Sequence, residues 1–230
     1  TRNDKSTPTA GLFLTGEWEL GQGTGIAPCS TTGTACFGLW PDGKATYQRT
    51  FFDLRSYSRL SPSGRLNLRL AGGGWLGGDQ LPLQRRLALG YPDPLPGYGY
   101  RELGCGGERY AGHPALCDRA LIVQAEFRTH LGLDIGPDWA TGDISGDEED
   151  RYEPFHVSGP DLVVFADAGR AWQVGEGAGT IPANRLPAFN SFKTDLGVGL
   201  DFGPIGLYLA KPLDRDIADV TFSVRMGRRF

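Results

Sequence analysis

The sequence has little methionine, few cysteines and no long apolar stretch. Met occurs once and Cys four times in 230 residues. Because no run reaches about 18 apolar residues, a transmembrane helix is excluded. The opening stretch TRNDKSTPT is not a signal peptide, and a start at Thr1 without Met suggests a processed or cut chain. Acidic residues number 27 and basic residues 23, without a basic patch, so nucleic acid is not an expected partner.

Helical periodicity is also missing, whereas alternation of apolar and polar residues is common. No Ser/Gly/Pro-rich linker separates regions of different composition, which favours one domain over residues 1–230. Alternation with a period of two predicts strands that each have one apolar face. The chain is therefore predicted to be all-β, with about eight strands at 11–20, 44–59, 65–70, 120–133, 162–172, 194–202, 205–213 and 220–230.

Alternation alone fits a soluble sandwich or soluble barrel as well as a membrane barrel. Strands of about ten residues, an inner face of small and charged side chains, and connections that alternate between short and long favour an antiparallel transmembrane β-barrel. In a sandwich, Val220, Phe222, Val224 and Met226 would instead pack in a core. The connection 136–160 is an exception, since it is long where a short turn is expected. The short connections are 61–64 and 203–204, and the other long ones are 21–41, 75–118 and 172–192.

The four cysteines form two local pairs in polar connections, Cys29 with Cys36 and Cys105 with Cys117. Such pairs predict two disulfides and an oxidising compartment. Four free thiols in a reducing compartment are the alternative.

Other polar residues give weaker signals. The histidines lack the spacing of metal ligands, so no metal site is predicted, and the acidic row 147–150 is interpreted as a solvated turn. A carboxylate site for hydrolysis is conceivable at Glu17, Glu19 and Asp53, although on a barrel wall such residues usually line the lumen. A small outer-membrane enzyme is favoured only if these carboxylates lie near a histidine; the histidines are His113, His130 and His156.

The stretch 81–102 is a long connection rich in Gly and Pro. Long connections in a compact domain are usually functional or disordered, and the aromatic and arginine residues of this one argue against disorder. We therefore expect a folded loop that presents Tyr98, Tyr100 and Arg101.

Several segments, in the same order along the chain as in a known family, carry a resemblance to that family. Leu95-Pro96-Gly97-Tyr98 falls where that family has Val-Arg-Gly-Phe or Val-Arg-Gly-Tyr, and Ala125-Glu126-Phe127 resembles its Gly-x-Ala-Glu-Phe strand. Phe165-Ala166-Asp167-Ala168-Gly169 matches its Phe-x-Asp-x-Gly strand at every fixed position. The chain thus resembles the carboxy-terminal half of the barrel of the BamA-type bacterial surface antigen superfamily. The other matches are Arg2-Asn3-Asp4 with Pro8-Thr9-Ala10-Gly11, Leu81-Pro82 to Leu89-Gly90, and a carboxy-terminal insertion signal with Phe222, Val224, Gly227 and Phe230.

The resemblance implies that the long loop lies in the barrel lumen, where a loop-tip arginine meets the acidic strands. Here that position is Pro96, so Arg101 is the predicted substitute, with Glu126 and Asp167 as its partners. A charge-assisted bidentate contact suits Arg better than Lys. Alternatively, Arg101 is a solvated loop charge and Asp167 pairs with Arg128 or Arg225.

The resemblance also implies a role in outer-membrane protein assembly or insertion, or in polypeptide translocation, with no cofactor and no enzymatic chemistry. Implied partners are the lipid bilayer of the Gram-negative outer membrane and unfolded outer-membrane proteins or secreted polypeptides. Three arrangements are considered, in order of preference. The first is half of a larger barrel whose amino-terminal half is missing, the second is a homo-oligomer, and the third is a small barrel with its loop outside. A small outer-membrane barrel enzyme or pore, and a soluble β-sandwich binding module, are the alternative classes.

Overall fold

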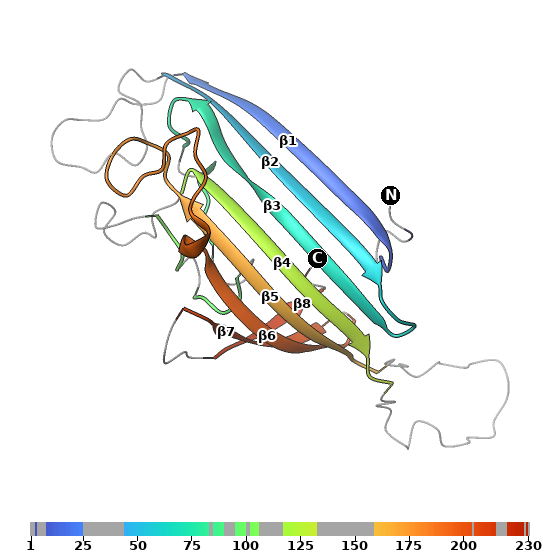
Figure 1. The fold of residues 1–230 in the computed structure, drawn as a ribbon. Helices are drawn as coiled ribbons and strands as arrows, with labels where there is room; N and C mark the ends of the chain where they lie inside the picture. The colour runs from blue at the N-terminus through green and yellow to red at the C-terminus, as the bar shows by residue number, and fades with distance from the viewer. Residues whose placement is uncertain are drawn as a thin grey trace, which may run out of the picture.

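The structure is a computed structural model that describes residues 3, 8–24, 44–82, 85–89, 95–99, 102–105, 117–132, 159–203, 205–214, 220–227 and 229. These residues form eight strands and a short 3-10 helix, η4. Figure 1 shows the strands side by side in a single rolled sheet, with β7 and β8 behind β5 and β6. The elements are β1 (Gly11–Thr24), β2 (Lys44–Arg59), β3 (Gly64–Gly78), β4 (Arg119–His130), β5 (Asp161–Trp172), η4 (Phe189–Ser191), β6 (Lys193–Asp201), β7 (Ile205–Pro212) and β8 (Thr221–Met226).

The sheet is an antiparallel meander in which each strand pairs with its neighbours in sequence, in the order β1 to β8. In the part of the chain that is described, β1 pairs with β2 alone and β8 with β7 alone, so the sheet does not close on itself. The prediction of an all-β antiparallel fold with about eight strands is confirmed. No helix among the described residues has the length and apolar character to cross a membrane.

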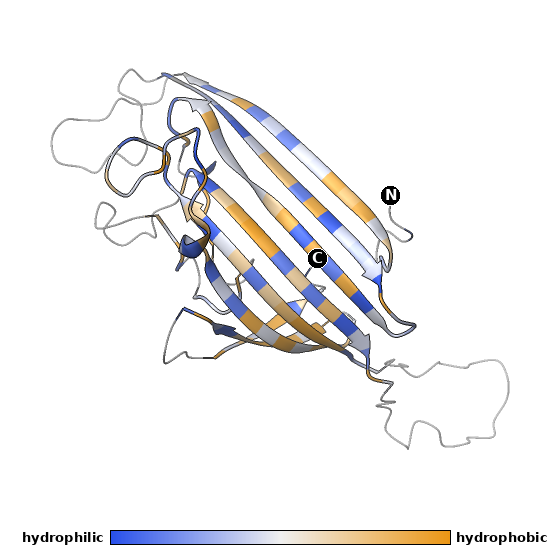
Figure 2. Ribbon diagram, in the orientation of Figure 1, coloured by the Kyte–Doolittle hydropathy of each residue, from blue (hydrophilic) through white to orange (hydrophobic). Residues whose placement is uncertain are grey.

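Apolar side chains lie on the outer face of the sheet and are exposed. Trp18 on β1 is 62% exposed, Val198 on β6 47%, and Phe222 on β8 59%. Figure 2 shows the resulting alternation of hydrophobic and hydrophilic residues along the strands. Among the residues that a sandwich would bury in its core, Val224 is 51% exposed and Met226 is 93% exposed. The sandwich interpretation is therefore wrong for this sheet, because its apolar face is the open one.

Several strand boundaries differ from the sequence prediction, and those of β1, β3 and β8 differ by four residues or more at their ends, since β1 runs through Thr24. Strand β3 runs through Gly78, so the long loop begins at Asp79 rather than at residue 75. Three successive glycines, 72–74, have no side chains that could alternate, and their strand therefore cannot be recognised by periodicity. Strand β8 ends at Met226, and Gly227 follows with φ +93°, a backbone conformation that favours glycine.

Candidate functional site

The inner face of the sheet carries rows of polar side chains that the strand register brings together. Asp167 on β5 lies opposite Gln124 on β4 and opposite Asp195 on β6. Both aspartates and Gln124 are at most 3% exposed. Because like charges directly opposite each other on a sheet are destabilising, this row requires partners that supply positive charge or N–H donors.

Two arginines supply most of the positive charge. The guanidinium of Arg128 on β4 donates to Glu126 on the same strand and to Asp201 on β6. The guanidinium of Arg229, beyond the end of β8, donates to Asp167, and its Nε lies 3.3 Å from Glu126 Oε2. All five side chains are 2% exposed or less. A network that joins β4, β5, β6 and the residue Arg229 beyond β8 is thus buried with its charges paired, as burial of charge requires.

Glycines on β6 make room for aromatic rings within this network. A Cβ at Gly197 would overlap the ring of Phe165 and lie 2.5 Å from the carbonyl oxygen of Leu209. The Phe165 ring packs edge-on against Tyr208, with 6.1 Å between centroids, and the Arg229 guanidinium lies 3.6 Å from the Phe165 ring centroid. Phe165 is therefore held between a bare stretch of backbone and a stacked cation.

The network continues toward β2 through the neutral amide of Gln124. Gln124 Nε2 donates to Asp167, 3.2 Å, and Gln124 Oε1 accepts from Arg69 on β3, 3.1 Å. Arg69 and Arg55 both donate to Asp53. Asp53 is therefore a lumen-lining ion-pair partner, and Glu17 and Glu19 likewise pair with Arg49. The clustering with histidine that would favour an enzyme does not occur among the described residues that contact these three carboxylates.

The tip of the long loop docks on the inner face of β6 and β8. The Gly97 N–H donates to Asp195 Oδ2 at 2.6 Å, and Thr221 Oγ1 on β8 donates to the Gly97 carbonyl at 3.2 Å. A Cβ at Gly97 would lie 2.8 Å from Asp195 Cβ and 3.1 Å from the backbone nitrogen of Pro212. The tip can approach this closely only because residue 97 is glycine.

Apolar loop residues bury against β4 and β5. Leu95 and Tyr98 are fully buried, and they form a cluster with Leu89, Ala120 and Ile122, together with Ala71. A Cβ at Gly169 would lie 2.6 Å from Leu95 Cδ1. The absence of a side chain at the glycine of the Phe-x-Asp-x-Gly segment therefore makes room for a leucine of the loop. Pro96, at the position of the family's arginine, is among the fully buried residues.

A polar latch, Tyr98 with Asp214 and Lys193, lies beside the loop tip. The Tyr98 hydroxyl is 2.6 Å from Asp214 Oδ1 and 3.1 Å from the carbonyl oxygen of Thr194, and Lys193 Nζ donates to Asp214 Oδ2. Burial and the neighbouring Asp214 carboxylate raise the pKa of Tyr98. Burial alone would raise the pKa of Asp214, but hydrogen bonds from Lys193 and Tyr98 outweigh it and lower that pKa.

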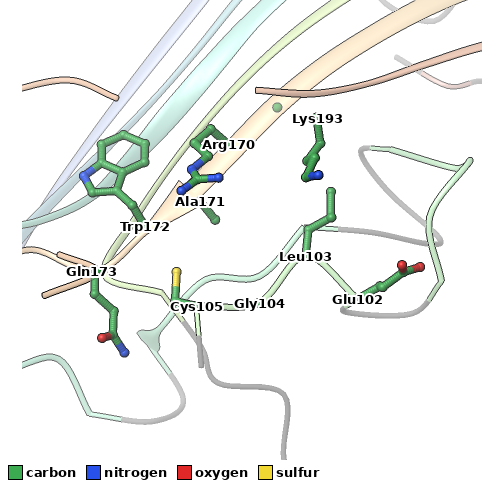
Figure 3. Close-up of a pocket in the computed structure, with 11 residues that line it drawn as sticks. Glu102, Leu103, Gly104, Cys105, Arg170, Ala171, Trp172, Gln173 and Lys193 are labelled. Carbon is green, nitrogen blue, oxygen red and sulfur yellow. The ribbon is translucent and has the colours of Figure 1, made fainter. Parts of the chain in front are cut away.

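The return of the loop forms a pocket next to the end of β5, shown in Figure 3. Cys105 and Cys117 form a disulfide, and Cys117 also pairs with Leu87 through two backbone hydrogen bonds. This confirms one of the two predicted disulfides. Figure 3 shows Cys105, Glu102 and Lys193 around the pocket. The loop is thus fastened at its base as well as at its tip.

The structure brings most of the predicted site residues to one place and adds Arg229 to them. Glu126 and Asp167 meet Arg229, and the predicted partner Arg101 lies outside the described residues, as do Cys29, Cys36 and Phe230. Phe222 and Val224 lie on the outer face of β8, away from the network, and Gly227 follows the strand. Sequence reasoning missed the roles of Asp195, Asp214 and Arg229. For Asp195 the available signal was its position on an alternating strand, next to the outward-facing Leu196.

The class of protein follows from these features, because an antiparallel sheet with exposed apolar residues outside and a buried ionic face inside has the architecture of a transmembrane β-barrel. A family model, the Omp85 superfamily domain, matches residues 1–230, and the chain therefore belongs to the Omp85 superfamily. This match is consistent with the resemblance to the BamA-type surface antigen superfamily. Omp85 proteins are outer-membrane proteins with general roles in protein assembly and translocation. No curated protein matches the sequence.

Proposed function

We propose that this chain is an outer-membrane β-barrel domain that inserts outer-membrane proteins or moves polypeptide across the outer membrane of a Gram-negative cell. The observation that carries the proposal is the open sheet with an exposed apolar outer face and a buried ionic inner face. Its partners are the lipid bilayer and unfolded outer-membrane proteins or secreted polypeptides. Membership of the Omp85 superfamily supports this role.

The edge of β8 is the proposed place of entry for a client strand. β8 is the shortest strand, with 6 residues, and its second edge has no partner strand among the described residues. Backbone groups that stay unpaired in lipid cost several kcal/mol each, so this edge has a strong tendency to bind another extended chain. The docked loop braces β4, β5 and β6 while the edge exchanges partners.

The outer face is tested first, with Val198→Arg as the variant. Val198 is 47% exposed near the middle of β6. A charge at the bilayer midplane destabilises a barrel by about 2–4 kcal/mol, so the variant should unfold at a lower urea concentration in lipid vesicles.

Light scattering of the wild-type chain in detergent gives its molecular mass. A mass twice that of one chain indicates two copies, and the mass of one chain indicates a monomer. A soluble wild-type monomer without detergent would refute the membrane assignment.

The assembly role is tested with vesicles that contain the wild-type chain and an unfolded outer-membrane barrel protein as client. Folded client is measured by its shifted migration on unheated gels. The chain should increase the rate of client folding over empty vesicles, and it should do so less when the edge is blocked by an excess of a peptide with the β8 sequence. Equal rates with and without the chain would contradict the proposal.

A further inference from the structure

Arg229 is held on the inner face in the way that a protein holds a bound ligand. Its guanidinium contacts the carboxylates of Asp167 and Glu126 and stacks on the ring of Phe165, 3.6 Å from the centroid. Its side chain is 1% exposed. Carboxylates in the plane of the guanidinium and an aromatic ring on its face are the two contacts that distinguish arginine from lysine.

The strand ladder does not place Arg229 in this position. The last residue of β8 in register is Met226, opposite Ile205, and the positive φ of Gly227 takes the chain out of the strand direction. Arg229 therefore reaches β4 and β5 from beyond the sheet. Side-chain contacts hold it there, and such contacts can be exchanged without breaking the ladder.

Without Arg229 the site would be strongly acidic. Glu126, Asp167, Asp195 and Asp201 are all 3% exposed or less, and Arg128 is the other arginine that the structure shows bonded to members of this group. Buried carboxylates are tolerated only when a cation or hydrogen-bond donors pair with them. An emptied site would therefore bind a replacement cation of suitable shape.

We propose that Glu126, Asp167 and Phe165 form a binding site for an arginine side chain of a polypeptide, and that Arg229 fills this site in the resting chain. The identity of the replacing polypeptide as a client rests on the proposed function. The short link from Met226 at the end of β8 gives Arg229 a high effective concentration at this site, so an external arginine enters only when Arg229 leaves. Release of Arg229 and capture of a basic client are thereby coupled.

The test is chemical rescue of the full chain in detergent. Arg229→Ala should lower the midpoint of thermal unfolding, and N-acetylarginine amide should raise the midpoint again in proportion to the logarithm of its concentration. N-acetylcitrulline amide, which has a similar shape and no charge, should have no effect. The wild-type chain, with its site filled, should show no shift with either compound.

Two controls separate a site from general stabilisation. Asp167→Asn combined with Arg229→Ala should abolish the rescue, whereas Arg225→Ala, which removes a different arginine over the ring of Tyr208, should not become sensitive to the compound. If Arg229→Ala does not fold alone, its refolding yield from urea is compared with and without N-acetylarginine amide.

Absence of rescue in both measurements, or equal rescue by citrulline, would overturn the inference. No client is present in this experiment, so its failure is distinguishable from failure of the assembly assay.

Discussion

Replacement of Gly97 by alanine is the sharpest test of loop docking. The new methyl carbon would lie 2.8 Å from Asp195 Cβ and 2.9 Å from Asp195 Oδ2, whereas carbon atoms in good contact are about 3.5–4.0 Å apart. Relief of this overlap requires the tip to move away from β6. That movement lengthens the 2.6 Å hydrogen bond from the Gly97 N–H to Asp195.

The expected cost is the sum of two effects. A hydrogen bond to a charged group contributes about 1.5–3 kcal/mol, and overpacking of a tight contact costs about 1–3 kcal/mol. Docking of the tip should therefore weaken by roughly 2.5–6 kcal/mol, which corresponds to a factor of about 70 or more in the docking equilibrium.

Hydrogen exchange, followed by mass spectrometry in detergent, measures this equilibrium directly. Peptides that contain residues 95–99 should exchange at least about 70 times faster in Gly97→Ala than in the wild type. The matched control is Gly99→Ala in the same loop, because its Cβ would meet the flexible carboxylate of Glu102 at 3.2 Å and no backbone atom. Equal protection in the two variants would refute the docked geometry.

Two further predictions concern the base of the loop and its latch. Replacing Cys105 and Cys117 by serine should lower stability by about 3 kcal/mol, as for a loop of similar length, measured by urea unfolding, and the variant should lose the wild type's sensitivity to reductant. Tyr98→Phe should cost about 1 kcal/mol, since Asp214 is partly exposed and screened by solvent. Because Lys193 and Tyr98 lower the pKa of Asp214, this stabilisation is complete above its ordinary pKa of about 3.9. The difference between wild type and variant should therefore shrink as pH falls below about 4, and a constant difference would contradict the latch.

The strands were predictable because alternation is a local property of the sequence. The limits of β2, Lys44–Arg59, agree with the prediction, and the predicted outward residues of β8 are exposed. The end of β3 was not predictable, since Gly73 and Gly74 have positive φ and no side chain. There a Cβ at Gly74 would overlap the carbonyl of Asp118, where the loop returns to β4. The run of glycines therefore allows the backbone of β3 to lie close to the backbone of its neighbours, and it does not form a turn.

The ionic site was only half predictable, for a related reason. The motif identified Asp167 and Glu126 as acidic partners, but the chain leaves the strand direction at Gly227, so alternation along β8 does not place Arg229. The pairing of Arg229 with carboxylates three and four strands away depends on how far the sheet curls. Curl is a property of the whole sheet that no local pattern expresses. The arginines that the sequence offered as partners were instead Arg101 on the loop, Arg128 on β4 and Arg225 on β8.

The docked loop and the open sheet explain each other. A closed barrel of eight strands is filled by its own side chains, yet here Leu95 and Tyr98 of the loop are fully buried against the inner face. Both conditions hold together only if the sheet has a larger radius than a closed eight-stranded barrel would give it. The edges of β1 and β8 then cannot meet, and in lipid their backbone groups require further strands. Those strands can come from the same polypeptide, from a second copy or from a client. Under the proposed function, the edge of β8 that has no partner strand among the described residues is the one that would accept a client strand.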